Sequence, residues 1–444
     1  MTGPLTISET VEFRVVLVEP ESRAVLVIDA VDGYCLPRIR ISQGTRSTKQ
    51  ICKAIKDMWG LHALIVEFVT MESGSTSCVV AELLNTTTAG FSLNAVELSD
   101  ISDLELSEIE RLAILQLLHG PMQKFPLRIG WIDEAIIWME RSTGRKLSSK
   151  WDIEQWNAGG GFALVKFQMD DGHVYWLKAT GAPNSHELAL MVHLSELCPD
   201  VVPPLVAVRN EWNAWLTENV GGALQNQPAA DVLVSAANGF ALLQFRTADC
   251  LDMFLSEGAF DQRLPVLRSH IDPIMAYLID AMERQESTKV ARLSCERLRE
   301  LADILREVCV RIEGLGIPDA LIHNDISASN ILYDEGRCVF IDWSEASVGN
   351  PFLSCERLCE LNPNHREKVQ SAYRRSWSQR LSATAIDEAF ALMPLLAIYA
   401  YLYGRGDWLT KQDIRPPFES YRRSLARHMD RAAKNTALLG VLCH

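Results

Sequence analysis

The sequence predicts an α+β protein in which an α/β domain precedes a small β-rich lobe and a large, mostly helical lobe. Short apolar strands surround one helical stretch in the first 120 residues, and apolar runs bounded by glycine turns follow between residues 151 and 222. From about residue 224 onward, apolar residues recur at the three- and four-residue spacing of helices. We therefore divide the chain into a front domain (1–120), a linker with a helix (121–150), a small lobe (151–222) and a large lobe (223–444).

The front domain is expected to begin with a β-hairpin formed by Val11–Val18 and Ala24–Ile28. Apolar spacing then predicts a helix over Ser47–Trp59, directly before a glycine. Two further strands are predicted near Ile65–Met71 and Ser77–Leu83. This order of elements predicts one sheet with one principal helix.

The order, together with Leu36-Pro37, Gly44 and Gly60-Leu61, resembles a Nudix hydrolase domain. The resemblance covers about a quarter of the chain. In that family, carboxylates on the helix bind metal ions against a diphosphate. The same carboxylates should therefore stand on the helix predicted here.

Most of these carboxylates are missing. Laid onto the family signature, Thr45 stands at the first glutamate, Lys53-Ala54 at the Arg-Glu pair, and Asp57-Met58 at the paired glutamates. Only Asp57 retains a carboxylate, which cannot assemble the metal cluster by itself. The resemblance thus implies a catalytically silent Nudix-like domain that serves as a docking, sensing or dimerisation module, with a homodimer forming through it.

The linker contains a predicted helix, Trp131–Glu140, ended by Ser142–Gly144. Its two tryptophans and three isoleucines recur at helical spacing. We expect this helix to pack on the small lobe, because an exposed linker helix would leave these side chains in water.

The small lobe opens with three consecutive glycines, Gly159, Gly160 and Gly161, before a predicted strand at Ala163–Gln168. Such a run either cradles phosphate through its backbone N–H groups or forms a flexible turn. The sequence leaves both interpretations open at this point.

A second strand, Val174–Lys178, ends in a lysine that interrupts an apolar run. Burying a lysine is costly unless it is paired. Glu187 is the expected partner, because Asn184-Ser185 can cap a helix over His186–Leu194. Glycine-rich loop, strand lysine and helix glutamate follow one another in the order of a kinase small lobe.

A strand within Trp215–Gly222 ends the small lobe. In a kinase it would become the hinge, where backbone groups of Glu218, Asn219 and Val220 pair with the adenine edge. The alternative is a strand that simply ends in a Gly-Gly turn.

The most informative segment is Leu321–Leu332, followed by Val339–Trp343. It spaces Asp325, Asn330 and Asp342 as a kinase catalytic loop does. Asp325 would accept the proton of a substrate hydroxyl, and Asn330 and Asp342 would hold Mg²⁺ against the nucleotide phosphates. Asp and Asn also cap turns, so turn capping is the alternative.

The pattern His323–Asn330, followed by Ile341–Trp343 and Gly349–Pro351, resembles the aminoglycoside phosphotransferase and choline kinase-like superfamily. Most aminoglycoside kinases have Gly at the place of Asn324 and Pro-Gly at the place of Ala328-Ser329. Asn tolerates left-handed backbone next best after Gly, so Asn324 is no obstacle. The departure leaves the substrate class open.

The resemblance implies a protein-kinase-like bilobal fold and a kinase that uses ATP or GTP with Mg²⁺. Its acceptor would be a hydroxyl of an aminoglycoside-, choline- or sugar-like small molecule. Glu345, Glu356, Glu360 and Asp407 could contact this acceptor, although solvated helix and turn charges have the same appearance. A second hypothesis is a non-catalytic pseudokinase or scaffold that acts through the Nudix-like domain.

Composition narrows the class of partner. A net charge of −14 over 444 residues disfavours nucleic acid and anionic membrane surfaces. The eleven cysteines are scattered without a C-x-x-C pair, so neither a disulfide framework nor a zinc ribbon is predicted. The chain also lacks eighteen consecutive uncharged apolar residues and a basic–apolar leader at its start, and we expect a cytoplasmic protein.

Overall fold

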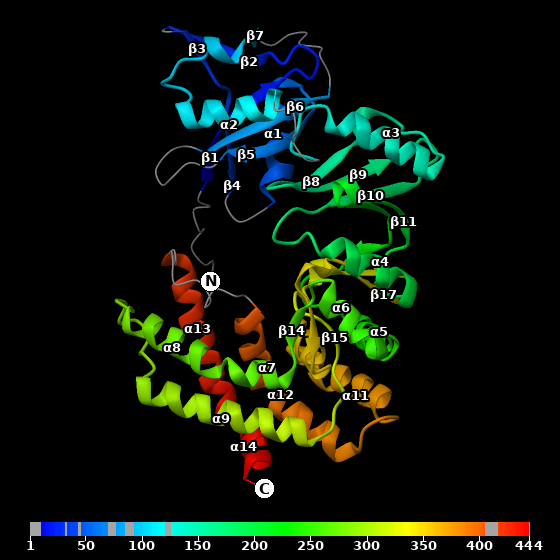
Figure 1. The fold of residues 1–444 in the computed structure, drawn as a ribbon, viewed down its shortest axis with the longest axis vertical. Coiled ribbons are helices and arrows are strands. Elements are labelled where there is room, and N and C mark those ends of the chain that lie inside the picture. Colours follow the sequence, from blue (N-terminus) through cyan, green and yellow to red (C-terminus); the bar gives the residue numbers. More distant parts are fainter. Residues whose placement is uncertain are drawn as a thin grey trace, which may run out of the picture. The chain divides into compact units, whose positions relative to one another are not determined.

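The computed structural model describes residues 10–31, 33–42, 46–69, 77–84, 93–119, 126–404 and 416–443, so Gly44, Thr45 and Asp407 lie outside the described residues. The chain forms two compact units. The first comprises Met1–Leu188 with Pro204–Asn219, and the second comprises Ala189–Pro203 with Val220–His444. Strands and helices occur in both units, which confirms the predicted α+β class (Figure 1).

The front of the first unit is a seven-stranded mixed sheet with the order β3-β2-β1-β6-β5, in which β4 also pairs with β1 and β7 with β2. Strands β1 and β6 are parallel, and the other pairs are antiparallel. The strands are β1 (Thr10–Val18), β2 (Val25–Ala30), β3 (Gly33–Cys35), β4 (Arg38–Ser42), β5 (Ala63–Val69), β6 (Ser77–Leu83) and β7 (Asn94–Val96). The predicted hairpin and the two later strands are thus confirmed, with ends shifted by one or two residues. The assignment of this sheet to the Nudix family stays a prediction.

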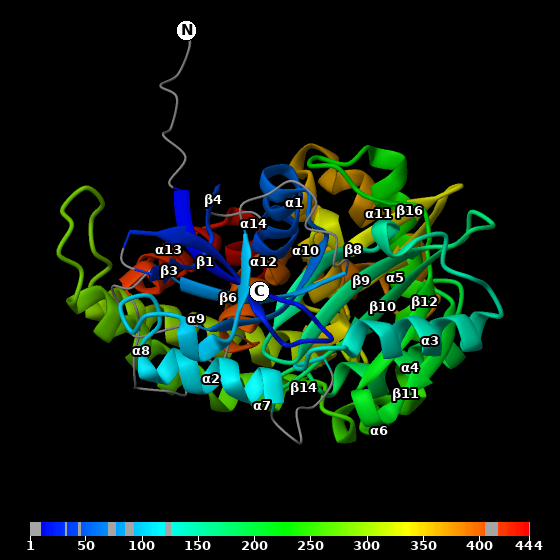
Figure 2. The ribbon, with the colours of Figure 1, turned by 90° about the horizontal axis from the view of Figure 1, so that it is seen from above.

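Helices cover both faces of this sheet (Figure 2). Helix α1 (Ser47–Trp59) has the predicted bounds, and its Ile51 shares a core with Val15 of β1. Helix α2 (Glu108–His119) packs Ile114 with Val16 on the opposite face. Adjacent β1 side chains point to opposite faces, so a single strand contributes to both cores.

A second, antiparallel sheet follows in the same unit, with the order β11-β12-β10-β9-β8. Its strands are β8 (Glu154–Gly159), β9 (Phe162–Gln168), β10 (Val174–Ala179), β11 (Leu205–Arg209) and β12 (Ala214–Glu218). The strands predicted for the small lobe are present with nearly the predicted bounds.

Helix α3 (Trp131–Thr143) joins the two sheets through one hydrophobic core. Trp131 and Ile132 are buried together with Val16 of the front sheet and with Val165 and Phe167 of the second sheet. The helix predicted for the linker therefore packs on the small lobe, as expected, and on the front domain as well. The apolar spacing predicted a buried face, but it could not indicate that two sheets cover it.

Strand β5 at the edge of the front sheet lies beside β8 at the edge of the second sheet. Here the side chain of Gln155 accepts from the N–H of Ile65 at 2.6 Å and donates to its carbonyl at 2.8 Å. Both strands change register at this place, between Ile65 and Glu67 on β5 and between Gln155 and Asn157 on β8. An amide side chain thus links two edges that would otherwise expose unpaired backbone groups.

The second unit is mostly helical, with two three-stranded sheets. Helices α8, α9 and α13 pack on one another (Figure 1). The sheets have the orders β13-β16-β17 and β14-β18-β15. The strands are β13 (Gly222–Ala223), β14 (Phe260–Gln262), β15 (Ala320–His323), β16 (Ile331–Asp334), β17 (Arg337–Phe340) and β18 (Ala346–Gly349). The helices are α4 (Glu187–Leu197, which begins in the first unit), α5 (Ala230–Thr247), α6 (Leu251–Ser256), α7 (Leu264–Ser269), α8 (Ile271–Glu283), α9 (Cys295–Gly314), α10 (Phe352–Leu361), α11 (Arg366–Trp377), α12 (Ala383–Gly404), α13 (Pro416–Ala433) and α14 (Thr436–Leu442).

One helical run is divided where the sequence pattern suggested continuity. Apolar residues recur at helical spacing over residues 264–284, yet the structure has two helices there, α7 and α8, with a break at His270. Pro273 explains the break, because a proline has no N–H to donate to the carbonyl of residue 269 and would clash with it. By length and composition α12 could cross a membrane, but it is mostly buried and packs on α9, α10 and α14, as a core helix does.

Candidate active site

The predicted lysine and glutamate form an ion pair in the first unit. Lys178 Nζ lies 2.5 Å from Glu187 Oε1. The side chain of Glu187 is only 1% exposed, and that of Lys178 is 13% exposed. The rings of Phe162 and Trp215 lie 5.5 and 5.7 Å from Nζ, within the range of cation–π attraction. The lysine is thus fixed by charge and by aromatic contacts, with its amine held at one position.

The three glycines close the β8–β9 hairpin. Gly159 pairs with Phe162, so only Gly160 and Gly161 connect the strands. The φ angles of the three glycines are 98°, 64° and 79°, and positive φ at both central residues is the geometry of a type I′ turn. A Cβ on Gly181 would lie 2.6 Å from the carbonyl oxygen of Gly160, so the turn also needs this fourth glycine close by. The run is therefore a tight, defined turn in this structure.

The backbone N–H of Gly160 already has an acceptor. It donates to both carboxylate oxygens of Glu67, at 3.0 and 2.9 Å. Glu67 belongs to β5 of the front sheet and interrupts an apolar run there, as Lys178 does on β10. Sequence reasoning did not select Glu67, although a lone carboxylate in an apolar strand was the available signal.

Two backbone N–H groups of the predicted hinge already donate to carbonyl groups of the same chain. Glu218 N–H donates to Pro204 O at 3.0 Å, and Asn219 N–H donates to Val174 O at 3.0 Å. Asn219 Oδ1 also accepts from the indole N–H of Trp176 at 2.9 Å. Glu218 and Asn219 end the first unit, and Val220 begins the second.

In the second unit, the residues of the predicted catalytic loop follow strand β15. The side-chain amide of Asn330 donates to Asp325 twice, to its backbone carbonyl at 2.9 Å and to Oδ2 at 2.8 Å. Asn330 lies in a short 3-10 turn just before β16, and its side chain is largely buried. The structure therefore brings Asp325 and Asn330 together as predicted, and the amide orients the carboxylate.

Asp342 follows β17 and has a left-handed backbone, with φ 65° and ψ 68°. This conformation costs a non-glycine residue about 1 kcal/mol or more and is frequent at functional sites. The hydroxyl of Ser344 donates to Asp342 Oδ1 at 3.1 Å. Asp342 has a positive φ, whereas Asn324 does not. The tolerance for left-handed backbone that we expected at Asn324 is thus unused.

His323 ties the two halves of this segment together. Its Nε2 is hydrogen-bonded to Ile341 O at 2.8 Å, and its ring lies 4.6 Å from that of Trp343. Ile341 N–H in turn donates to Asn330 O at 3.0 Å. These bonds fix the residue before Asp342 against the loop that carries Asp325 and Asn330. The buried histidine thus has a positioning role.

The oxygen donors of this segment suit a hard cation such as Mg²⁺. The amide nitrogen of Asn330 donates to Asp325, so the Oδ1 atom of Asn330 remains available as an acceptor. The hydroxyl of Ser329 donates to this Oδ1 at 3.4 Å. Asp342 supplies a carboxylate. Within the described residues, no three His, Cys, Asp or Glu side chains cluster as metal ligands. Any metal here would thus rely on two side chains and on oxygens of its substrate.

Two of the four carboxylates considered for the acceptor form internal ion pairs. Glu356 accepts from both terminal nitrogens of Arg366, at 2.6 and 2.8 Å, and Glu360 accepts from Arg357 at 2.7 Å. Burial raises the pKa of Glu360. Glu345 lies half-buried in the turn after Asp342. The ion pairs favour the interpretation of Glu356 and Glu360 as structural charges.

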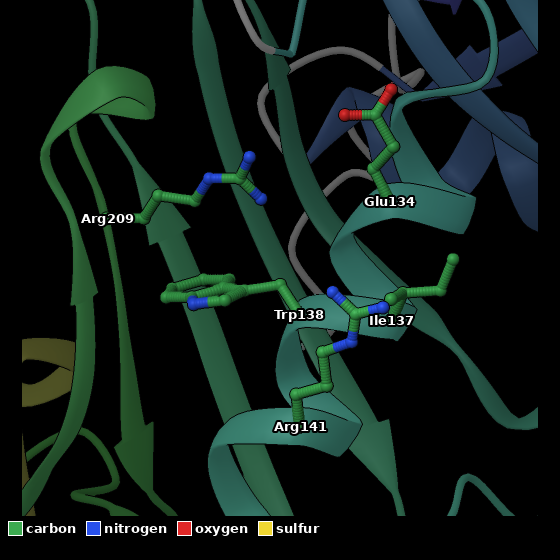
Figure 3. Close-up of a pocket in the computed structure, with 5 residues that line it drawn as sticks. All are labelled: Glu134, Ile137, Trp138, Arg141 and Arg209. Atoms are coloured by element: carbon green, nitrogen blue, oxygen red, sulfur yellow. The ribbon is translucent and has the colours of Figure 1, made fainter.

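A separate pocket lies on the first unit, between α3 and β11 (Figure 3). It has a volume of about 490 Å³, and the indole of Trp138 lies between the guanidinium groups of Arg209 and Arg141. The Arg209 guanidinium stacks 3.4 Å from the ring centre of Trp212. This pocket contains none of the residues predicted for nucleotide binding, so it does not mark that site.

The central part of the chain matches one family model. Residues 187–353, which include Glu187, Asp325, Asn330 and Asp342, match the phosphotransferase enzyme family. This match supports a phosphotransferase. No curated protein sequence matches the chain.

Solved structures similar to this chain include two choline or ethanolamine kinase structures and a macrolide phosphotransferase. A choline/ethanolamine kinase family protein from Mesorhizobium loti is 15% identical, with a TM-score of 0.48 over 70% of this chain and 99% of that one. Choline kinase from Cryptosporidium parvum is 16% identical, with a TM-score of 0.48 over 70% and 97%. Macrolide 2′-phosphotransferase from Brachybacterium faecium is 16% identical, with a TM-score of 0.44 over 67% and 98%. These values are too low to identify an acceptor.

Proposed function

We propose that this protein is an ATP-dependent phosphotransferase that transfers a phosphoryl group to a hydroxyl of a small molecule. The observation that carries the proposal is the pair of hydrogen bonds from Asn330 to Asp325, at 2.9 and 2.8 Å. A turn cap would need only the bond to the backbone. The second bond fixes the carboxylate itself, which is what a catalytic base requires.

Asp325 acts as the base that orients and deprotonates the acceptor hydroxyl. Its Oδ2 accepts from Asn330, and no hydrogen bond involving Oδ1 occurs among the described residues, so Oδ1 is the oxygen that can accept the substrate proton. Proton acceptance by a positioned carboxylate contributes mainly as the transition state forms.

Asn330 Oδ1 and the carboxylate of Asp342 would hold Mg²⁺, which would neutralise charge on the transferred phosphoryl group. The left-handed backbone at Asp342 and the hydroxyl of Ser344 fix the direction of that carboxylate. Lys178, held by Glu187, supplies the positive charge for the nucleotide phosphates.

The acceptor is an aminoglycoside-, choline- or sugar-like alcohol. A panel of such compounds, incubated with the protein, Mg²⁺ and either ATP or GTP, would be analysed for phosphorylated product by mass spectrometry. We expect product with ATP from the wild type and none from Asp325→Asn, whose side chain keeps its size but loses the base. Equal product from both proteins would refute the role of Asp325.

A non-catalytic scaffold is the second candidate, and one observation favours it. The N–H of Gly160, which would donate to a phosphate oxygen in a kinase, donates to the carboxylate of Glu67 instead. A scaffold would bind no nucleotide at millimolar concentration, whereas a phosphotransferase should melt at a higher temperature with ATP and Mg²⁺.

A further inference from the structure

The contact between Glu67 and Gly160 joins the front sheet to the glycine-rich turn of the second sheet. Both carboxylate oxygens lie within hydrogen-bond distance of the Gly160 N–H, at 3.0 and 2.9 Å. Oε1 also accepts from the N–H of Phe68 at 2.8 Å. Backbone N–H groups of a glycine-rich turn bind anions, and here the anion is a side chain of the same chain.

The local backbone is shaped to admit this carboxylate. A Cβ on Gly159 would lie 3.0 Å from Glu67 Oε1 and 3.0 Å from Phe68 Cδ2. Gly159 also has a φ of 98°, which favours glycine independently. A side chain at this position would therefore require the side chains of Glu67 and Phe68 to shift, which would disturb the contact.

The direction of Glu67 is set by a register shift on β5 between Ile65 and Glu67. Such a bulge adds a residue to one strand and turns the following side chain. Gln155 binds both backbone groups of Ile65 immediately before the bulge. Phe68, directly after Glu67, packs with Ala158 against the core that β5 shares with α1. The residues on each side of Glu67 are thus held by the second sheet.

Helix α1 anchors the same edge. Lys49 Nζ lies 3.4 Å from Glu154 Oε2 and 4.2 Å from the centre of the Trp156 ring. The Arg46 guanidinium lies 4.6 Å from the centre of the same ring. These contacts hold α1 and the front sheet against β8. The position of Glu67 therefore depends on how the front sheet packs on β8.

We propose that Glu67 is an autoinhibitory group, which competes with a nucleotide phosphate for the N–H of Gly160. The inference rests on the proposed function, since it assigns the glycine-rich turn to phosphate binding. A phosphate oxygen bound to this N–H would lie close to the Glu67 carboxylate, and their negative charges repel at such a distance. Triphosphate binding therefore requires Glu67 to leave, and any ligand that moves β5 away from β8 makes it easier.

Glu67→Gln tests the proposal, because it keeps the shape and removes the charge. We expect the full-length variant to bind ATP with Mg²⁺ about tenfold more tightly than the wild type in calorimetric titration, and to bind adenosine with unchanged affinity. Adenosine has no phosphate, so it reports changes in the base-binding surface alone. Glu211→Gln is the matched control: it removes a carboxylate of the first unit whose side chain is 78% exposed and which lies away from the turn and from the β5–β8 edge, and it should leave the ATP affinity unchanged.

The outcomes separate this inference from the proposed function. If the wild type binds ATP and Glu67→Gln binds it no more tightly, or gains equally for adenosine, the autoinhibitory role is refuted and the phosphotransferase stands. If neither protein binds ATP, both proposals fall. Hydrogen exchange tests the Gly160–Glu67 hydrogen bond in the absence of nucleotide. The Gly160 amide proton should exchange faster in Glu67→Ala than in the wild type. Unchanged exchange would show that the hydrogen bond does not form in solution.

Discussion

Replacing Lys178 with methionine should destabilise the first unit and remove nucleotide binding, because one substitution disturbs two properties. The lysine neutralises Glu187, whose side chain is only 1% exposed. Lys178 Nζ lies 2.5 Å from Glu187 Oε1. Methionine keeps most of the apolar stem, so the main loss is the charge. A buried carboxylate left without its partner typically costs about 3–5 kcal/mol. For a unit of this size, each kcal/mol lowers the melting temperature by about 2–4 °C.

We therefore expect a fall of roughly 6–20 °C in the melting temperature of the first unit for Lys178→Met. The double variant Lys178→Met/Glu187→Leu removes both charges and should recover most of this loss, because an apolar pair can replace a buried ion pair at little cost. It should not recover nucleotide binding, since the positive charge that Lys178 supplies to the phosphates is still missing. Differential scanning calorimetry with and without ATP and Mg²⁺ measures both effects.

The matched control is Lys166→Met on the neighbouring strand β9. Lys166 lies 3.6 Å from Glu154, and the two side chains are 28% and 47% exposed. Exposed pairs contribute about 0–1 kcal/mol, so this variant should melt close to the wild type. The reasoning fails if the double variant is as unstable as Lys178→Met, since the lysine would then act through its contacts with Phe162 and Trp215.

Three further predictions follow from other sites. Asp325→Asn should keep nucleotide affinity but lose most of kcat, whereas Asp342→Asn should weaken Mg²⁺-nucleotide binding and make activity depend on added metal; titration calorimetry and steady-state kinetics would show the reverse pattern if these assignments were exchanged. Burial raises the pKa of Glu82 from 4.5 to about 7, so the folded state retains a proton that the unfolded chain releases. Stability should fall as pH rises from about 4.5 to 7, and Glu82→Gln should remove this dependence and add up to about 3 kcal/mol at pH 8, measured by urea unfolding; a flat wild-type profile would contradict the assignment. The full chain should not hydrolyse nucleoside diphosphate derivatives with Mg²⁺ or Mn²⁺, and turnover that is lost on Asp57→Ala would overturn the silent front domain.

The elements that local pattern determines could be predicted from the sequence. The helix over Ser47–Trp59 has the predicted bounds because its apolar period and the following Gly60, with a φ of 65°, are local signals. Asp325 and Asn330 are only five residues apart, so their contact needs no distant partner, whereas their catalytic roles stay predictions. Pro273 is a local signal for the break at His270, because proline has no N–H donor. Apolar spacing alone does not contain this information.

What could not be predicted depends on residues far apart in the chain. The spacing in α3 predicted an apolar face, yet nothing local indicates that Trp131 is covered by both sheets. Glu67 and Gly160 are 93 positions apart, and their contact needs a bulge on β5 and the side chain of Gln155 on β8. Bulges shift the register by one residue, and sequence periodicity does not locate them reliably.

The hydrophobic core that the two sheets share limits how far they can move apart. Val16, Trp131 and Phe167 are buried in a single hydrophobic cluster, so separating the sheets would expose apolar surface on both. Large separation is therefore unfavourable, so release of Glu67 would take a small displacement at the β5–β8 edge. A hydrogen bond weakens steeply as it lengthens beyond about 3.5 Å. Since the bonds from Gly160 to Glu67 are 2.9–3.0 Å long, a shift of less than 1 Å at this edge is enough to release the turn.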